Sequence, residues 1–413
     1  MSVTDAPGRT DVVIVGAGPV GSFLACLLGA LGVRVLILER RDQALDRSMA
    51  IGIMPPTLSR FAALGLTREL VAAGCPVREA VVHDATRPLG RLDFSTLPEP
   101  YPFLLSLPQR HLVRTLWQRM RATESVRFET GVRATTIVQD AADVAVHLES
   151  GTDASSRQTV RGRFLALCDG ARGPLRAQLG VDRPARRYAP SFVMGDAADD
   201  TGWGHVAHIF FTPSGSVESF PLPAGRRRWV ALADPADASD DAVHLARRVG
   251  RIAGLRLPAD AIRESSRFTP EYRLVRRYRV GRVALCGDAA HIMSPIGGQG
   301  MNVGLGDAWR LAAVLAALVR EDGRPEPLFA QYERRRRRAF RRASHRAAAG
   351  MWLGTRTGSA ASRLRAAVIR HGLLRPAPVR QRLALSFSMW TIPEGDDPVL
   401  RTFRRRLEGG RDT

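Results

Sequence analysis

Three glycines near the N-terminus stand at a spacing suited to binding a dinucleotide. Gly16, Gly18 and Gly21 follow the β-branched run 11–15 and precede an apolar helical stretch. The first permits a tight turn, the second leaves room for a pyrophosphate, and the third lets helix and strand pack closely. Glu39 stands 18 residues after Gly21 at the end of a second strand, where it can accept hydrogen bonds from an adenosine ribose. These residues predict a dinucleotide site.

A second glycine cluster lies late in the chain, in the segment GDAAHIMSPIGGQGMN. Asp288 directly follows a buried strand, so its carboxylate can bind a hydroxyl of a ribityl chain. Gly297, Gly298 and Gly300 leave backbone amides bare at the start of a long helix, which suits an electron-rich carbonyl edge or an anion. The two clusters together favour a flavin dinucleotide.

The elements that must position these residues form a doubly wound α/β fold. Residues 11–40 predict a βαβ unit, and parallel strands need such a crossover. Helices are expected at 56–73 and 109–123. Further strands are expected at 126–149, 160–168 and 282–288, an antiparallel sheet over 190–277, and helices from about 303 with a break near Pro325 and Pro327.

The pattern predicts interleaved domains. We expect a nucleotide-binding domain from residues 1–76, 106–184 and 278–330. The Pro-rich and aromatic stretch 77–105 is expected to leave it and join a sheet domain with 185–277, and residues 331–413 form a C-terminal helical region.

Composition limits the chemistry. The chain has 413 residues and a net charge of +21, and all of its 61 basic residues are arginine, so every mechanism that needs a lysine amine is excluded. Four cysteines without a CxxC spacing predict neither a dithiol nor a zinc site. We expect no metal and a reducing, cytoplasmic location, since no signal segment or uncharged apolar run of membrane-spanning length is present.

Three blocks resemble the single-component FAD-dependent aromatic hydroxylases typified by p-hydroxybenzoate hydroxylase. They are GAGPVG with Glu39, LALCDGARGPLR, and CGDAAHIMSPIGGQGMN, and they span residues 11 to about 320. The resemblance implies FAD as cofactor, NAD(P)H as a transient electron donor and dioxygen as co-substrate. It implies cofactor contacts from Gly16, Gly18, Pro19, Gly21, Glu39, Arg40, Arg47, Gln109, Asp169, Asp288, Pro295, Gly298, Gly300, Met301 and Asn302.

The Asp-Gly block departs from the family pattern at two positions. Gly173 and Pro174 stand where a serine and a small apolar residue are usual, whereas Asp169 and Arg176 are retained. In the family this block serves both FAD and the nicotinamide donor, so the departure concerns the affinity for the donor. Since the chain has one glycine fingerprint, NAD(P)H is expected to bind near the flavin without a Rossmann domain of its own.

By the same resemblance, the sheet strands 205–211 and 220–223 face the substrate. From them we expect His208, Phe210, Phe220 and Pro221 at the pocket. Alternation alone does not show which face of the strand 205–211 is turned toward the pocket. The competing interpretation for the histidines of this strand is that they fill the core. His291 is expected to have a structural or phosphate-side role.

The activity that the resemblance implies is hydroxylation of an aromatic or polyketide-type small molecule through a flavin C4a-hydroperoxide. Binding and water exclusion matter more than acid/base groups in this chemistry, so no catalytic residue is named. Baeyer-Villiger oxygenation and FAD-dependent reduction remain alternatives on the same fold. The absence of lysine excludes a flavin halogenase.

The run 333–346 holds eight arginines in fourteen positions. Nucleic-acid elements usually add aromatics to such a run, and only Phe340 is present, so we expect a solvated helix, no nucleic-acid partner and no membrane partner. The alternative hypothesis is that the run forms a surface that binds an anionic partner. The stretch after residue 350 lacks a βαβ pattern, which predicts a short family form without a C-terminal thioredoxin-like domain; the oligomeric state is left open.

Overall fold

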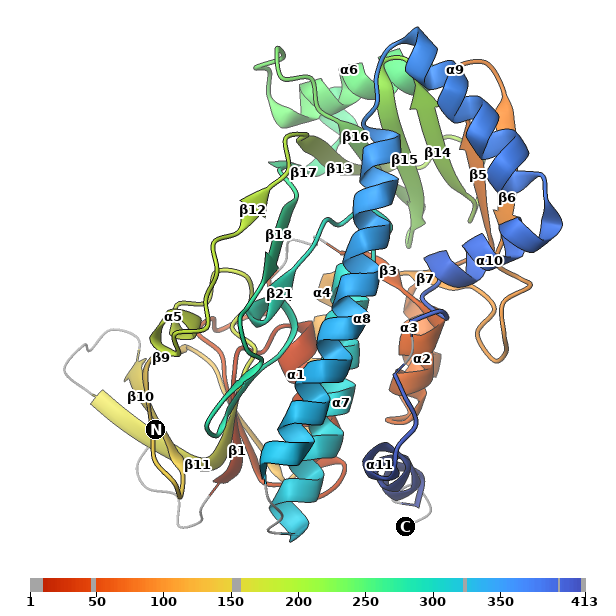
Figure 1. Ribbon diagram of the computed structural model, residues 1–413. Coiled ribbons are helices and arrows are strands. Elements are labelled where there is room, and N and C mark those ends of the chain that lie inside the picture. The colour runs from red at the N-terminus through yellow and green to blue at the C-terminus, as the bar shows by residue number, and fades with distance from the viewer. Residues whose placement is uncertain (1–9, 46–49, 151–156, 322–324, 393, 410–413) are drawn as a thin grey trace.

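Two large sheets occupy opposite ends of the molecule (Figure 1). This computed structural model describes residues 10–45, 50–150, 157–321, 325–392 and 394–409. The sheets are joined by small sheets and by one long helix, and the candidate site lies between them.

The first sheet is the doubly wound layer expected from the βαβ unit. Five of its strands are parallel, in the order β20-β11-β1-β2-β8. The helix Pro19–Gly29 makes the crossover from β1 to β2, and the helix Gln109–Arg121 leads into β8. Strand β10 pairs antiparallel with β11, and β9 pairs antiparallel with β10. Strand β19 pairs antiparallel with β20 at the edge of the sheet. Its strands are β1 (Thr10–Val15), β2 (Val35–Leu38), β8 (Val126–Glu129), β9 (Val132–Gln139), β10 (Val144–Ser150), β11 (Arg157–Leu167), β19 (Arg279–Val280) and β20 (Val283–Leu285).

The second sheet has seven strands, in the order β17-β13-β16-β15-β14-β5-β6. Its strand β5 pairs in parallel with β14, which brings the stretch 77–105 to the sheet formed by later residues. The strands are β5 (Glu79–His83), β6 (Pro88–Asp93), β13 (Phe192–Ala198), β14 (Ala207–Thr212), β15 (Gly215–Leu222), β16 (Arg226–Leu232) and β17 (Arg263–Phe268). We propose that the two sheets mark the two domains, with the limits expected from the sequence.

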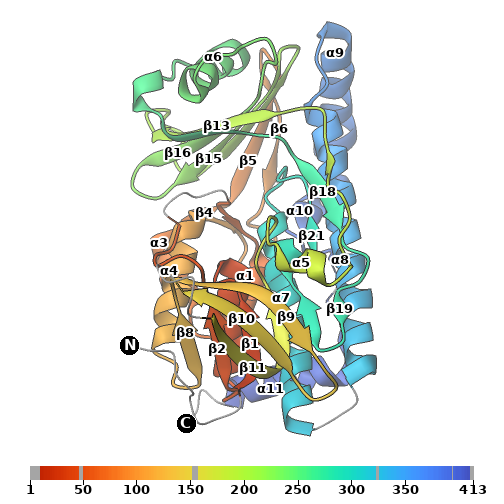
Figure 2. The same cartoon turned by 90° about the vertical axis from the view of Figure 1, so that its left-hand side faces the viewer.

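Two small sheets lie between the large ones, and Figure 2 shows β4 and β18 in this region. One contains β3 (Gly52–Ile53), β7 (Leu104–Ser106) and β4 (Cys75–Val77), and the other contains β12 (Arg186–Arg187), β18 (Glu271–Leu274) and β21 (His291–Ile292).

Beside the first sheet, α1 (Pro19–Gly29) packs against both α4 (Gln109–Arg121) and α7 (Gly300–Glu321). The window Gly300–Arg320 is long and apolar enough to cross a membrane, but 89% of it is buried inside the protein, as in a core helix. Helix α8 (Pro325–Gly354) runs from the first sheet to the second (Figures 1 and 2).

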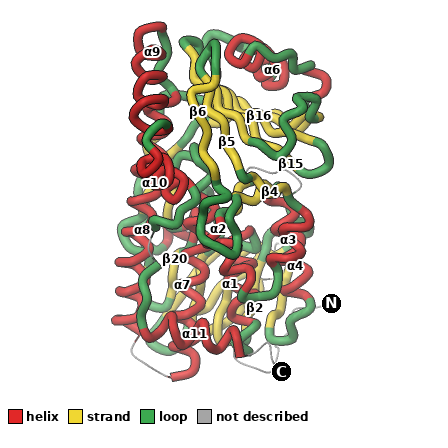
Figure 3. Tube along the Cα trace, turned by 90° about the vertical axis from the view of Figure 1, so that its right-hand side faces the viewer, coloured by secondary structure: helices red, strands yellow, loops and turns green. Residues whose placement is uncertain are grey.

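The C-terminal region is helical. It contains α9 (Ser359–Ala367), a π-helical segment (Val368–Leu374), α10 (Ala377–Phe387) and α11 (Pro398–Gly409). Figure 3 shows α9 and α10 beside β5 and β6, and the π-helical segment and α10 contact β6. Shorter helices are α5 (Leu175–Gln178) and the 3₁₀ turns Ala259–Ala261 and Gly287–Ala289.

The observed helices correct two expectations. The expected helix 56–73 is split into α2 (Pro55–Ala62) and α3 (Thr67–Ala73), because Gly65 between them has a left-handed φ of 73°. The stretch 190–277 contains α6 (Asp241–Ala253), which sequence alternation did not indicate; the Asp240 side chain caps its start and Gly254, with φ 70°, ends it.

Candidate active site

The three N-terminal glycines occupy the turn between β1 and α1. A Cβ on Gly16, whose φ is 100°, would lie 2.4 Å from the Cys168 carbonyl oxygen, and one on Gly21 would lie 2.0 Å from the Gly16 carbonyl oxygen. Gly18 differs, because nothing lies within 4 Å of a Cβ built on it. Two glycines are therefore required by packing, and Gly18 leaves open space at the N-terminus of a helix.

Glu39 closes one end of this space. Its carboxylate accepts hydrogen bonds from the Ala17 amide at 2.9 Å and from the Arg41 amide at 3.2 Å. It borders a cavity of about 40 Å³ that also touches Gly18 and Pro19. Arg40, next to it, is exposed. Arg47 lies outside the described residues.

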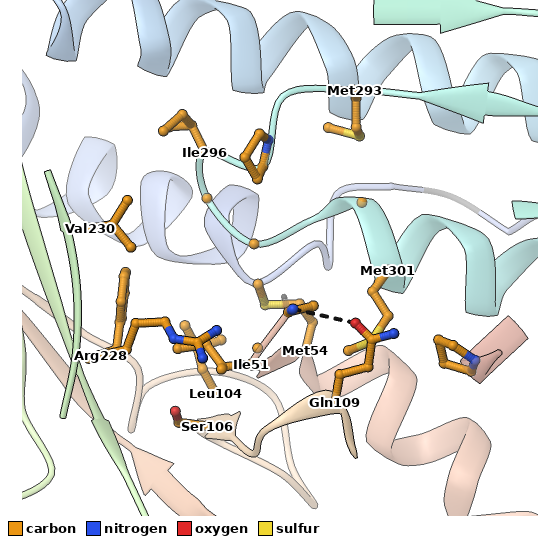
Figure 4. Close-up of a pocket in the computed structure, with 18 of the residues that line it drawn as sticks. Ile51, Met54, Leu104, Ser106, Gln109, Arg228, Val230, Met293, Ile296 and Met301 are labelled. Atoms are coloured by element: carbon orange, nitrogen blue, oxygen red, sulfur yellow. Dashed lines mark hydrogen bonds between the residues drawn. The ribbon is translucent and has the colours of Figure 1, made fainter. Parts of the chain in front are cut away.

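A larger cavity of about 440 Å³ begins on the other side of the same turn. Gly18, Pro19 and Gln109 border both cavities, so an elongated ligand can reach from Glu39 into the larger one. Gln109 begins α4, and its side-chain oxygen accepts a hydrogen bond from the Ala50 amide at 3.4 Å (Figure 4).

The second glycine cluster, which leads into α7, lines the larger cavity. Pro295, Gly298, Gly300 and Met301 all border it, and Figure 4 shows Met301 facing Gln109 across the space. Helix α7 begins at Gly300, so its first-turn amides have no intrahelical acceptor.

Asn302 plays a different part from its neighbours. Its side chain accepts a hydrogen bond from the Met54 amide at 2.9 Å and donates to the carbonyl oxygens of Gly52 at 2.9 Å and Gly298 at 3.1 Å. This buried side chain thus ties the glycine loop to β3, and any contact with a cofactor would come from its backbone.

Two aspartates follow the ends of neighbouring strands of the first sheet, Asp169 after β11 and Asp288 after β20. Asp288 borders the larger cavity, and the surrounding protein reduces the hydration of its carboxylate, which raises its pKa. Burial also raises the pKa of Asp169 to about 6, against the opposing charge of Arg176. Neither buried oxygen of Asp169 has a hydrogen-bond partner in the described protein.

One departure in the Asp-Gly block, Gly173, has a steric reason. A Cβ on Gly173 would lie 1.9 Å from the Asp169 carboxylate, so the usual serine could not occupy this position in the observed conformation. Arg176 is turned inward, where it bonds Asp182 at 2.9 Å and the Ala289 carbonyl oxygen at 3.3 Å. Arg176 therefore joins the Asp-Gly block to the turn that carries Asp288.

The substrate-side residues expected from the sequence divide between the two faces of the second sheet. Phe220 borders the cavity. His208 and Phe210 do not, and they correct that expectation: they lie on the opposite face, where Phe210 packs in the cluster under α6. Pro221 is buried and does not border the cavity, and its carbonyl oxygen accepts a hydrogen bond from Ser106.

His208 belongs to a stack of rings on that opposite face. Its ring lies 3.8 Å from that of Trp203, centroid to centroid, and its Nδ1 lies 2.9 Å from Nε2 of His83. Burial, followed by the charge of His83, lowers the pKa of His208 to about 4. This is core filling, the competing interpretation for the histidines of the strand.

The cavity face of the sheet presents two charged residues that sequence reasoning missed. They are Glu218 on β15 and Arg228 on β16, and Arg228 bonds the buried Asp196 at 2.6 and 2.8 Å. Choosing the other face of the alternating pattern would have selected Glu218, since it is two residues from Phe220. Figure 4 shows Arg228 and Val230 directed into the cavity.

A further cavity of about 360 Å³ lies beyond the glycine loop, between the sheet and helices α8 and α10. It shares with the larger cavity the residues Ile209, Glu218, Phe220, Ile296, Gly297 and Phe387. The walls are mostly apolar, which suits a ring system.

The arginine run does not form a wholly solvated helix. Arg336 is buried and bonds Asp307 at 2.6 Å, and the other carboxylate oxygen of Asp307 bonds His291 at 2.6 Å. Burial raises the pKa of Asp307, but the charges of His291 and Arg336 outweigh it and hold the value below the usual range. His291 is thus bonded within the fold, although it also borders the larger cavity, and Arg334, Arg338 and Arg341 are the exposed members of the run.

These features fit FAD. Gly18 leaves the cradle for a pyrophosphate, and Asp288 and the start of α7 border one cavity. No group of three or more His, Cys, Asp or Glu side chains among the described residues is arranged to hold a metal.

Comparison with known proteins agrees. Residues 9–347 match the family model described as an FAD binding domain. The chain is 35% identical over 412 residues to a 6-methylpretetramide 4-monooxygenase of Streptomyces rimosus, covering 96% of this chain and 67% of that protein. It is 33% identical over 349 residues to an anhydrotetracycline monooxygenase of Streptomyces rimosus, with 80% and 67% covered.

Solved structures show the same fold. The p-nitrophenol 4-monooxygenase PnpA from Pseudomonas putida DLL-E4 superposes with a TM-score of 0.83 at 26% identity, over 92% of this chain and 97% of that one. OxyS anhydrotetracycline hydroxylase from Streptomyces rimosus gives 0.75 at 28% identity, over 95% and 78%.

One further relative is a 3-(3-hydroxy-phenyl)propionate/3-hydroxycinnamic acid hydroxylase of Mycolicibacterium smegmatis, and the chain spans 60% of its length. The chain thus covers about two thirds or less of the length of the three curated relatives. The matched family model nevertheless covers both glycine clusters and both sheets. The chain belongs to the FAD-binding family of flavin-dependent aromatic monooxygenases.

Proposed function

We propose that this protein hydroxylates a polycyclic, polyketide-type aromatic substrate with electrons from NAD(P)H and one atom of dioxygen. The observation that carries the proposal is the continuity of space from Glu39, past Gly18, to the glycine loop and then into an apolar cavity under the second sheet. The relatives named for tetracycline-type substrates support a ring system of that size.

The chain's own residues would hold FAD along this path. Glu39 and the Gly18 turn take the ADP part, Asp169 and Asp288 offer carboxylates to hydroxyls, and the amides at the start of α7 face the flavin ring. When bound, FAD would supply the redox chemistry: two electrons from the donor would reduce dioxygen, one of its oxygen atoms would enter the substrate and the other would leave as water.

The protein's remaining contribution is orientation and exclusion of water. Phe220, Ile296 and Phe387 stand where the larger cavity meets the further one, so a flat ring between them would lie against apolar walls. Fixing two reactants in this way removes most of the entropic cost of their encounter. Water is displaced because these walls offer it few hydrogen-bond partners.

The nicotinamide donor would bind transiently beside the flavin. The first sheet carries one glycine fingerprint, and Gly170 and Pro295 border the larger cavity with exposed or partly exposed surface. The exposed arginines Arg334, Arg338 and Arg341 add positive potential that favours a phosphorylated donor.

The test is rapid-mixing reduction of the purified yellow protein by NADH or NADPH, with phenols, polycyclic polyketides and indoles as candidate substrates. A substrate is expected to accelerate both flavin reduction and oxygen uptake. Product analysis must show one added oxygen on an intact ring; a lactone would indicate Baeyer-Villiger oxygenation. A saturated product without oxygen uptake would indicate a reductase, and a colourless protein would contradict the proposal.

A further inference from the structure

Glu218 stands at the junction of the two ligand cavities. It lies in the middle of β15, opposite Ile209 on one neighbouring strand and Val230 on the other. Because Phe220 is two residues further along the same strand, both side chains project from the same face of the sheet. Glu218 and Phe220 border both the larger and the further cavity.

The carboxylate of Glu218 has no partner in the described protein. No hydrogen bond or ion pair of the described residues involves it, and burial alone raises its pKa to about 7. A buried acid without a partner destabilises a fold, so packing gives no reason for its presence. Its accessible surface faces the cavities, where a ligand would lie.

Two charged groups that border these cavities, Arg228 and Arg346, are engaged elsewhere, and Asp288 and His291 border the larger cavity from the turn after β20. Arg228, on the adjacent strand β16, is held by Asp196 on β13. Arg346, on α8, borders the further cavity and donates a hydrogen bond to the Ser386 carbonyl oxygen at 3.4 Å. The glycine loop and α10 contribute uncharged residues to this junction, namely Ile296, Gly297, Gln299 and Phe387.

We propose that Glu218 receives a hydroxyl group of the aromatic substrate, as hydrogen-bond acceptor and then as proton acceptor. In that step the substrate O–H bond breaks, the proton moves to a Glu218 oxygen, and the electron pair stays on the substrate as a phenolate. The phenolate increases electron density on the ring that is to be oxygenated, and the proton returns to the product oxygen afterwards. This inference rests on the proposed function.

The proposal specifies the substrate class. A substrate with a hydroxyl placed toward the second sheet satisfies the carboxylate, since O–H donors to carboxylates form short, strong hydrogen bonds. A substrate that presents a carboxylate there is disfavoured by like-charge repulsion. We therefore expect a hydroxylated polycyclic ring, with the hydroxyl at Glu218 and the neighbouring rings in the further cavity.

Three probes of equal ring size test this on the FAD-loaded protein: 2-naphthol, 2-methoxynaphthalene and 2-naphthoate. Their affinities are measured by calorimetry at about pH 6 and about pH 8, a range over which a phenolic hydroxyl keeps its proton. The variants are Glu218→Gln, Glu218→Asp and the control Glu79→Gln, which changes a carboxylate paired with Arg91 at the surface of the same sheet.

The unaltered protein is expected to bind 2-naphthol more tightly as pH rises, by up to about tenfold over this range, because Glu218 ionises within it. The methoxy compound should show no such rise. Glu218→Gln should remove the pH dependence, Glu218→Asp should retain it with weaker binding, and Glu79→Gln should change nothing. Unfolding curves confirm that each variant is folded.

Three results would overturn the assignment: a pH dependence that survives Glu218→Gln, no preference of the unaltered protein for 2-naphthol over the methoxy compound, or tighter binding of 2-naphthoate. None of these depends on turnover. A protein that binds 2-naphthol as expected but shows no substrate-stimulated oxygen uptake would refute the proposed function and leave the role of Glu218 in binding.

Discussion

At the scale of single residues, the site separates groups that serve the fold from groups that serve a ligand. Gly16 and Gly21 are required because a Cβ at either would collide with backbone, whereas Gly18 faces open space. The side chain of Asn302 makes three hydrogen bonds within the protein. The carboxylates of Asp169 and Glu218 make no hydrogen bond to the described residues. An acceptor that the protein itself leaves without a partner is a candidate contact for a bound molecule.

Substitution of two of the glycines should separate cofactor binding from folding. Gly18→Val is expected to leave the fold intact and to lower FAD binding at least about tenfold, because the side chain fills the pyrophosphate space. Gly21→Val should instead lower the unfolding temperature, since its Cβ would lie 2.0 Å from a carbonyl oxygen. Flavin absorbance after desalting and thermal unfolding measure the two effects; loss of folding in Gly18→Val would contradict this assignment.

Glu218 should reduce stability at neutral and alkaline pH. Its pKa is about 7 in the folded protein, against 4.5 for an ordinary glutamate, so the unfolded chain ionises first and stability falls as pH rises from 4.5 to about 7. Glu218→Gln is expected to remove up to about 2 kcal/mol of this loss between pH 5 and pH 8. Urea unfolding at both pH values checks it, and an unchanged difference between them would refute the shifted pKa.

At the scale of elements, a buried ionic network fixes the helix that carries the glycine loop. Asp307 on α7 bonds His291 next to the Asp288 turn, Arg336 on α8 and the Gly287 amide. Helix α8 is thereby attached to both the loop and the first sheet. The arginine-rich sequence is thus explained in part by packing, with Arg336 inside and its neighbours on the surface.

Breaking this network should destabilise the whole unit. Asp307→Asn leaves a buried arginine without its anion, which costs about 3 to 5 kcal/mol. The expected outcome is a clear drop in unfolding temperature together with weaker FAD retention, because the glycine loop loses its support. Asp396→Asn is the control, since its pair with Arg401 is exposed and is worth under about 1 kcal/mol. Equal effects of the two variants would contradict the argument.

At the scale of the whole molecule, the substrate space exists only where separate parts meet. The further cavity has one wall from the second sheet, another from α8 and a third from α10, which are far apart in the sequence. Helix α8 spans the distance between the two large sheets (Figure 2), so it sets the width of this space.

Filling the further cavity from α8 tests its role. Gly350 borders it, and a Cβ there would lie 3.6 Å from Cγ2 of Ile296, an ordinary contact, so Gly350→Leu should fold. The remaining side-chain atoms would occupy the space, and affinity for a three-ring or four-ring phenol should fall about tenfold or more, with FAD binding unchanged. Calorimetry measures both, with Ala360→Leu on exposed α9 as control. Unchanged affinity would place the substrate elsewhere.

The sequence by itself determined the chemistry that depends on local spacing. The order strand, glycine turn, helix, strand and acid defines a βαβ dinucleotide unit, because each role is set by neighbours within a few residues or by the sheet connection. The glycine cluster after Asp288 and the start of a helix at Pro325 are equally local, and the structure has α7 begin at Gly300 and α8 at Pro325. The nature of the cofactor follows from the coexistence of the two clusters.

The tertiary structure decided which side of each element meets the ligand. Alternation in 205–211 shows that the strand has two faces, but α6 covers the face of His208 and Phe210, and that helix comes from residues some thirty positions later. Glu218 borders the cavities because the fold brings β15 close to α8 and to the glycine loop. Burial, desolvation and the width of a cavity arise from contacts between distant segments, and no local pattern encodes them.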